Sequence, residues 1–140
     1  MKKRGFTLIE LLVVIAIIGI ISSIVIISVR VARERAKDTR IKADMIQIRT
    51  AAEMYYSGPG NDSYLGFSCT VTEPNMAELC ADINSQLSGN PTIVVKSDNT
   101  GYCAYKQLMS TKYFCVDSIG RAEEYVAVPT TCVAATASCQ

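Results

Sequence analysis

The 140-residue sequence contains no histidine and no tryptophan, and aromatic residues make up only 7% of it. Without histidine, the chain lacks the side chain that most often acts as a general base near neutral pH, and it lacks imidazole ligands for zinc. We find no nucleophile–base pair and no phosphate-binding loop. The sequence therefore predicts a protein that is not an enzyme and that needs no cofactor.

The charged residues are unevenly distributed, although the net charge is only +1. Ten of the 14 Lys and Arg residues precede position 50, whereas nine of the 13 Asp and Glu residues follow it. Such asymmetry predicts two zones with different surroundings. We expect the basic residues between positions 30 and 42 to face lipid headgroups. DNA stays open as a partner of this segment, which has few aromatic residues for stacking on bases.

Residues 6–29 form an apolar run of 24 residues whose only charge is Glu10. As a helix the run is about 36 Å long, enough to cross a bilayer core of about 30 Å. A cleaved secretory signal is disfavoured because no Ala-x-Ala site follows before Arg30. A plain signal anchor fits poorly because basic residues flank both ends of the run.

Residues 2–10, Lys-Lys-Arg-Gly-Phe-Thr-Leu-Ile-Glu, resemble the processing site of type IV pilins and pseudopilins. The resemblance implies that a membrane peptidase cuts after Gly5 and methylates the new amino terminus at Phe6. It also implies that Glu10 pairs with the Phe6 amine of a neighbouring subunit and so sets the register of a filament. The alternative is that Glu10 only stabilises the start of its own helix, where the helix dipole favours a negative charge.

These features predict four segments: a cleaved leader (1–5), a membrane-spanning or filament-core helix (6–29), an amphipathic continuation of that helix (30–56) and a disulfide-stapled globular head (57–140). Apolar residues in the continuation recur at spacings of four and three, which makes one helical stripe. We expect this stripe to contact the core of the protein's own head. It consists of Ile41, Met45, Ile48, Ala52 and Tyr55.

The head combines one short helix with several strands. Apolar residues from Met76 to Leu87 have helical spacing, and Gly89 is expected to end that helix. Alternating patterns and turn residues predict strands at Thr92–Lys96, Tyr102–Leu108 and Lys112–Ser118, with an edge strand at Glu124–Val128. The expected fold class is therefore α+β, with a long N-terminal helix packed on a small antiparallel sheet, similar in outline to a type IV pilin.

Six cysteines in a small head favour disulfide staples, and six allow 15 pairings. We expect sequential pairing. A hairpin centred on position 109 would place Cys103 opposite Cys115, and the other two bridges would be Cys69–Cys80 and Cys132–Cys139.

Metal binding is not predicted. The cysteines contain no Cys-x-x-Cys motif. Asp98, Asn99 and Asp117 carry oxygen atoms that suit calcium, as a loop does in some pseudopilins, but turn chemistry explains Asp98 and Asn99.

The resemblance implies a structural subunit of a type IV pilus-like surface filament, polymerised through its N-terminal helix and serving adhesion, twitching motility or DNA uptake. The implied partners are other copies of the chain, a prepilin peptidase, an assembly ATPase and a platform protein. The precursor would cross the cytoplasmic membrane once with its head outside, before joining an extracellular filament. Two alternatives remain: a pseudopilin of a type II secretion or competence machine, and a membrane-anchored extracellular binding module that does not polymerise.

Overall fold

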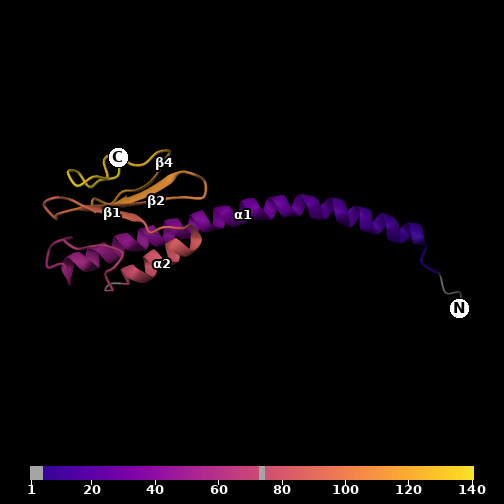
Figure 1. Cartoon of the computed structure of the whole chain (residues 1–140), viewed down its shortest axis with the longest axis horizontal. Helices are drawn as coiled ribbons and strands as arrows, with labels where there is room; N and C mark the ends of the chain where they lie inside the picture. The colour runs from indigo at the N-terminus through magenta and orange to yellow at the C-terminus, as the bar shows by residue number, and fades with distance from the viewer. Residues whose placement is uncertain (1–4, 73–74) are drawn as a thin grey trace. The chain divides into compact units, whose positions relative to one another are not determined.

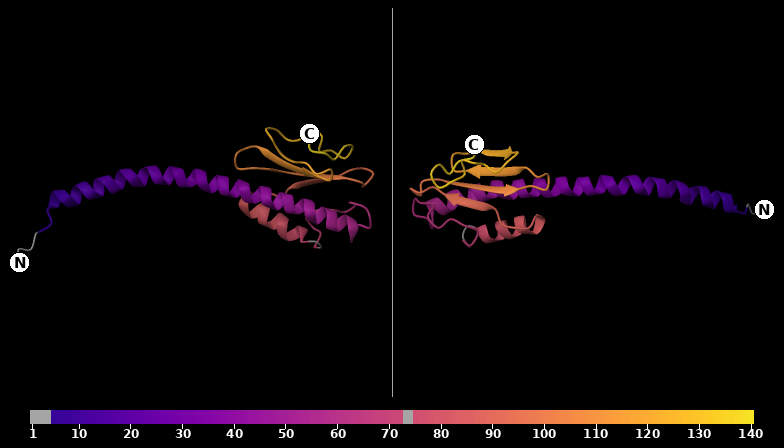
Figure 2. Two further views of the ribbon diagram at one scale, coloured as in Figure 1. Left: turned by 180° about the vertical axis from the view of Figure 1, so that it is seen from behind. Right: turned by 45° about the horizontal axis from the view of Figure 1, so that its top comes forward.

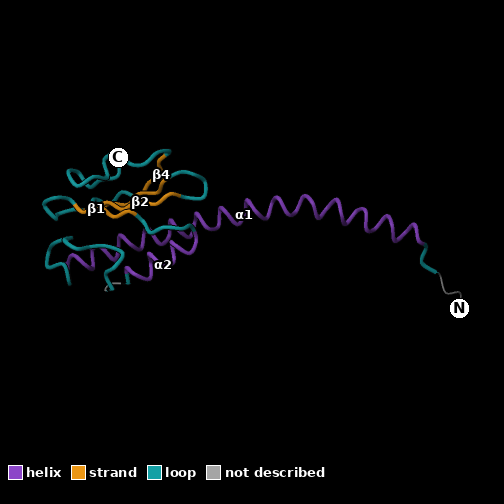
Figure 3. Tube along the Cα trace, viewed as in Figure 1, coloured by secondary structure: helices purple, strands orange, loops and turns teal. Residues whose placement is uncertain are grey.

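The computed structural model describes residues 5–72 and 75–140, so residues 1–4 of the expected leader lie outside the described part. Within these ranges the chain forms two helices and four strands (Figures 1 and 3). The chain divides into two compact units, residues 1–34 and residues 35–140. The elements are α1 (Leu8–Ser57), α2 (Met76–Gln86), β1 (Thr92–Val95), β2 (Tyr102–Gln107), β3 (Tyr113–Asp117) and β4 (Ala122–Tyr125).

The first unit is a helical segment, the N-terminal part of α1, preceded by residues 5–7, which belong to neither helix nor strand. The large apolar side chains described there are exposed, for example Leu8 (80%) and Ile24 (64%). By length and composition, α1 has a stretch able to cross a membrane. Because such a surface is unfavourable in water, it needs lipid or other protein surfaces to cover it.

The second unit has its main core between two helices and one face of the sheet (Figure 2). The predicted stripe on α1 is confirmed as part of this core, with Ile41, Met45, Ile48 and Ala52 all fully buried. From the other elements the core takes Met76 and Ile83 of α2, Tyr102 and Ala104 of β2, and Phe114 and Val116 of β3.

The four strands form one antiparallel sheet in the order β1-β2-β3-β4. The expected edge strand at Glu124–Val128 is wrong in its bounds, because β4 runs over Ala122–Tyr125. The strand starts earlier because Gly120, with a φ of +97°, closes a tight turn directly after β3 and starts the return pairing at once.

Two buried polar side chains join the helices to the sheet. The Asp38 carboxylate on α1 accepts hydrogen bonds from the backbone amides of Met109 (2.5 Å) and Ser110 (3.1 Å) at the β2–β3 turn. The Lys106 ammonium of β2 donates to the carbonyl oxygens of Ser88 (3.0 Å) and Gly89, just beyond α2. It satisfies carbonyl oxygens near the negative end of that helix, although burial lowers the pKa of Lys106.

A second cluster lies on the opposite face of the sheet, where the C-terminal segment covers β2 and β3. The structure joins Cys69 to Cys80, as expected, but the other two expected pairings are wrong. Cys103 is bonded to Cys132, and Cys115 to Cys139. All six cysteines are therefore in disulfides.

The hairpin register explains the correction. Position 110, not 109, is the centre of the β2–β3 hairpin, so Cys103 lies opposite Asp117 and Cys115 lies opposite Tyr105. The two cysteines are therefore displaced along the strands and cannot bond each other. Since both residues belong to the cluster beneath the C-terminal segment, each bonds a cysteine of that segment instead.

Candidate functional site

The predicted processing site lies on an exposed part of the chain. Gly5 is exposed, and Phe6 retains 71% of its accessible surface. A Cβ atom placed on Gly5 would meet no other atom within 4 Å. The fold itself therefore has no need for glycine at this position, so any requirement for a small residue comes from a molecule that acts on the site.

Thr7 and Glu10 form a reciprocal cap at the start of α1. The Glu10 carboxylate accepts hydrogen bonds from the Thr7 backbone amide and from the Thr7 hydroxyl, both at 2.8 Å. In return, the Glu10 amide donates to the Thr7 hydroxyl at 3.3 Å. This is a capping box, which satisfies amide groups that the first turn leaves unpaired.

Sequence reasoning missed the role of Thr7, although Thr-x-x-Glu directly before an apolar run is a recognised signal for a capping box. The cap matches the alternative in which Glu10 stabilises its own helix. It also fixes the carboxylate close to Phe6, where the new amino terminus would lie after cleavage. The capping role and a role in register are therefore compatible.

An open apolar hollow lies beside this cap, along one face of the helix. It measures about 440 Å³ and is lined by Glu10 together with Phe6, Ile9, Val13 and Val14. A single carboxylate on an otherwise apolar exposed surface suits contact with an apolar neighbour that brings one cationic group.

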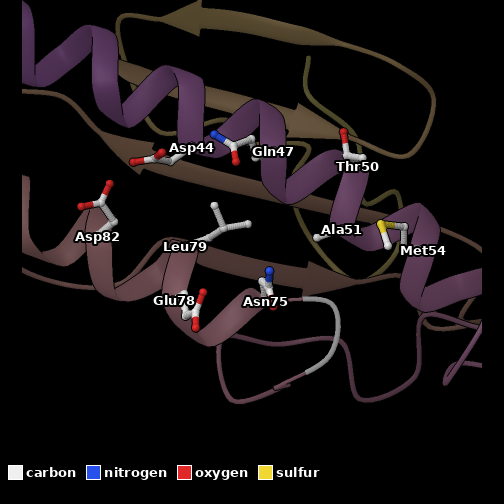
Figure 4. A pocket seen from close by; sticks show the side chains of 9 residues that line it. All are labelled: Asp44, Gln47, Thr50, Ala51, Met54, Asn75, Glu78, Leu79 and Asp82. Atoms are coloured by element: carbon white, nitrogen blue, oxygen red, sulfur yellow. The ribbon is translucent and has the colours of Figure 1, made fainter.

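A second candidate surface is the groove between α1 and α2, which we call the acidic groove (Figure 4). The groove has a volume of about 470 Å³. Its carboxylates come from Asp44 on α1 and from Glu78 and Asp82 on α2. The other residues that line it are Gln47, Thr50, Ala51, Met54, Asn75 and Leu79.

The charges in the acidic groove are only partly paired. Arg40 holds Asp82 with two hydrogen bonds, from Nε to Oδ2 (2.8 Å) and from Nη2 to Oδ1 (2.9 Å). These bonds lower the pKa of Asp82 and raise that of Arg40. Asp44 is only 7% exposed, and its Oδ2 atom has no hydrogen-bond partner among the described residues. Burial, together with the nearby Asp82 carboxylate, raises the pKa of Asp44 to about 6.

The acids considered as calcium ligands are engaged in local hydrogen bonds. Asp98 accepts bonds from Lys96 and from the amide and hydroxyl of Thr100, so it closes a turn. Asp117 accepts three backbone amide bonds, from Ile119, Arg121 and Cys139. Over residues 5–72 and 75–140, no group of three or more His, Cys, Asp or Glu residues is placed to hold a metal ion.

An exposed apolar helix with a capped glutamate near its start, joined to a small α+β head, defines a class of proteins that assemble through their N-terminal helices. Residues 1–26 match the family model of the prokaryotic N-terminal methylation motif. No solved structure matches the chain significantly.

Three relatives agree with this class. The chain is 32% identical over 89 residues to the type II secretion system core protein G of Escherichia coli K12, a match over 61% of this chain and 60% of that protein. It is 36% identical over 106 residues to a probable minor fimbrial protein of Dichelobacter nodosus, over 71% and 60% respectively. It is 37% identical over 93 residues to the type IV wide pilus major component PilA4 of Thermus thermophilus, over 60% and 70%.

The chain therefore belongs to the type IV pilin and pseudopilin family. The matches to the secretion protein and to the minor fimbrial protein span 60% of each relative's length.

Proposed function

We propose that this chain is a structural subunit of a type IV pilus-like surface filament, and not an enzyme. The observation that carries the proposal is the N-terminal methylation motif at the start of a helix whose described apolar side chains are exposed. Relatives named as a pilus component and a fimbrial protein support it. Adhesion, twitching motility and DNA uptake are the activities that such a filament would serve.

In this proposal, a prepilin peptidase cuts after Gly5 and the new amino terminus at Phe6 is methylated. The precursor sits in the cytoplasmic membrane, with residues 6–29 in the bilayer and the head outside. An assembly ATPase and a platform protein then move the subunit into the filament. The apolar helix exchanges lipid for the helices of other subunits, so it stays covered throughout.

In this proposal, the Glu10 carboxylate sets the axial alignment of each helix relative to its neighbours in the filament. In an apolar filament core, an unpaired carboxylate is costly, and the methylated Phe6 amine of a neighbouring copy is a cation able to pair with it. Only one axial offset between two copies brings the two groups together. The pair therefore selects an arrangement more than it adds stability.

A pseudopilin is the second candidate function. The observation that favours it is the similarity to type II secretion system core protein G, found in relatives from several bacteria. A pseudopilin would be cut and methylated at the same positions, but it would form a short assembly instead of long surface filaments.

Intact-mass measurement of material sheared from native cells, without reducing agent, tests the proposal. We expect a chain that starts at methylated Phe6 and is six hydrogens lighter than its fully reduced form. A chain cut after Gly5 but absent from the sheared fraction would favour the pseudopilin. A chain found only in the membrane and uncut would instead indicate an anchored binding module.

A further inference from the structure

The acidic groove contains a carboxylate, that of Asp44, for which the described part of the head provides no N–H or hydroxyl donor. Its hydrogen-bond contact is with the Asp82 carboxyl, which is itself an acceptor when ionised. Asp44 is only 7% exposed and lines the groove, and its Oδ2 atom accepts no hydrogen bond. Figure 4 shows its carboxylate facing Asp82 across the groove. A buried carboxylate that faces a second carboxylate is unfavourable, and a cationic donor that enters the groove would relieve this repulsion.

The groove suits a cationic side chain better than a metal ion. The Arg40 guanidinium already binds both oxygen atoms of Asp82, and its positive charge would oppose a divalent ion nearby. One free carboxylate oxygen, with the polar side chains of Gln47 and Thr50 also lining the groove, suits a donor with several N–H groups. The apolar side chains of Met54 and Leu79 offer a surface for the methylene stem of an arginine.

Arg35 of the same helix is the arginine whose position fits a contact between copies. It is exposed, and no ion pair is found for it in the described ranges. Arg35 precedes Asp44 by nine residues, which is about 2.5 helical turns and about 14 Å of rise. The two side chains therefore lie on opposite faces of α1, and Arg35 cannot reach the groove of its own chain.

A donor on one face and an acceptor on the opposite face give a heterologous contact, in which one surface of a copy meets a different surface of the next. Such a contact repeats from copy to copy and does not close into a dimer. We propose that the acidic groove is the receiving half of such a contact, in which Asp44 accepts hydrogen bonds from the guanidinium of Arg35 of a neighbouring copy. This inference rests on the proposed filament function and names a contact between heads in addition to the Phe6–Glu10 pair. The contact requires parallel copies offset by about 14 Å along the helix axis, whereas the Phe6–Glu10 pair, four residues apart, requires about 6 Å. The two contacts therefore join different pairs of copies.

A double-mutant cycle in the native host tests the contact. The variants are Asp44→Asn, Arg35→Gln and their combination, and the readout is the yield of sheared filaments. We expect each single change to lower the filament yield about tenfold. The double variant should have the same yield as the single variants and not a further tenfold loss, because both changes remove the same interaction.

Two matched controls accompany the cycle. Lys37→Gln removes a positive charge two residues away, but Lys37 lies about two turns before Asp44 and so on the same face of α1. Its effect is expected to be small and independent of Asp44→Asn. Asp62→Asn removes an exposed carboxylate outside the groove and should not change the yield. Thermal unfolding of each extracted full-length variant, with its disulfides intact, at a temperature no lower than that of the wild type excludes misfolding as the cause.

A cross-linking measurement separates this inference from the filament proposal. In Arg35→Lys, a carbodiimide can condense the new amine with a nearby carboxylate, forming an amide with loss of water. A covalent dimer joining position 35 to Asp44 in filaments or in native membranes supports the contact, and in membranes it would do so even if no filaments formed. Arg35→Lys filaments that form but lack this dimer, or independent effects of Asp44→Asn and Arg35→Gln on the filament yield, would overturn it. Filaments weakened by EDTA only when Asp44 is present would instead assign the groove to a metal ion.

Discussion

The Asp117 carboxylate accepts a hydrogen bond from the backbone amide of Cys139 at 2.9 Å, so the last residue of β3 holds the C-terminal segment of the chain. The Arg121 guanidinium donates to the carbonyl oxygen of the same cysteine at 3.0 Å. Together with the Cys115–Cys139 disulfide, these bonds fasten the segment to the face of the sheet away from the helices. This small head is therefore closed on one face by packing and on the other by covalent and polar links.

Replacing Asp117 by alanine should destabilise the head markedly. The side chain is fully buried and satisfies the amides of Ile119, Arg121 and Cys139, which would lose their acceptor. We expect a loss of about 2–4 kcal/mol in the free energy of unfolding, measured by denaturant titration of the full chain in detergent. Asp62→Asn at an exposed position is the control, and equal stability of the two variants would contradict the assigned role.

The two disulfides of the C-terminal segment should be found by mapping and should each be important for stability. A digest without reducing agent should contain Cys103 linked to Cys132 and Cys115 linked to Cys139. Replacing both Cys103 and Cys132 by serine opens a link with a sequence separation of 29, for which the chain-entropy model gives about 3–4 kcal/mol. The segment should then become sensitive to protease. A Cys103–Cys115 peptide in the digest would refute this arrangement.

Gly5→Val should block processing without disturbing the fold. A Cβ at this position meets no atom of the chain within 4 Å, so the folded head should keep its thermal stability. On expression with the peptidase, the variant should retain the mass of the uncut precursor, whereas the wild-type chain should lose residues 1–5. Cleavage at the wild-type rate would show that Gly5 is not required for processing.

The variants Glu10→Gln and Glu10→Ala distinguish the helix-capping role of Glu10 from its proposed role in filament register. Glutamine can still accept the Thr7 amide bond and so preserve the capping box, but it carries no charge. If Glu10 sets register by charge, both variants should be cut normally and both should lose filaments by about tenfold or more. Thr7→Ala, which weakens the cap and keeps the charge, should be milder. Normal filaments from Glu10→Gln would show that the charge of Glu10 does not set the register and that Glu10 only caps its helix.

The stability of the head should fall as pH rises through about 6. The pKa of Asp44 is raised in the folded state, so between its ordinary value near 4 and about 6 the folded chain binds more protons than the unfolded chain. The favourable contribution is therefore fully present below about pH 4 and is lost as pH rises through 6. The groups that face Asp44 are Arg40 on its own helix and Asp82 on α2, and Glu78 lines the same groove.

Thermal unfolding of the full chain between pH 4 and pH 8 measures this dependence. Asp44→Asn should be more stable than the wild type at pH 7 and should flatten the profile in this range, while Asp62→Asn should leave it unchanged. A profile for Asp44→Asn that parallels the wild type would contradict the assignment.

Local sequence patterns predicted the elements of the head well where hydrophobic periodicity is strong. The stripe from Ile41 to Tyr55 and the short helix that starts at Met76 both follow helical spacing, and both are buried as that spacing requires. The capping box at Thr7 was not predicted, although it depends only on residues three apart and its Thr-x-x-Glu pattern is present in the sequence.

The disulfide pairing and the acidic groove depend on contacts between distant parts of the chain. Because the centre of the hairpin lies one residue further along than expected, Cys103 and Cys115 are not opposite each other. Each of them instead bonds a cysteine of the C-terminal segment. Similarly, nothing near Asp44 in the sequence predicts that it will be buried facing Asp82, which lies 38 positions further along the chain.

The sequence by itself determined the N-terminal methylation motif, the apolar helix and the family, because these depend on short-range order: basic residues at positions 2–4, Gly5, Phe6 and one glutamate in an apolar run. Only the tertiary structure decided which cysteines bond and which carboxylate is left unpaired, because strand register and helix packing set those distances. Register depends on the turn and on the whole buried face together, and a change of one residue in it alters every cross-strand neighbour.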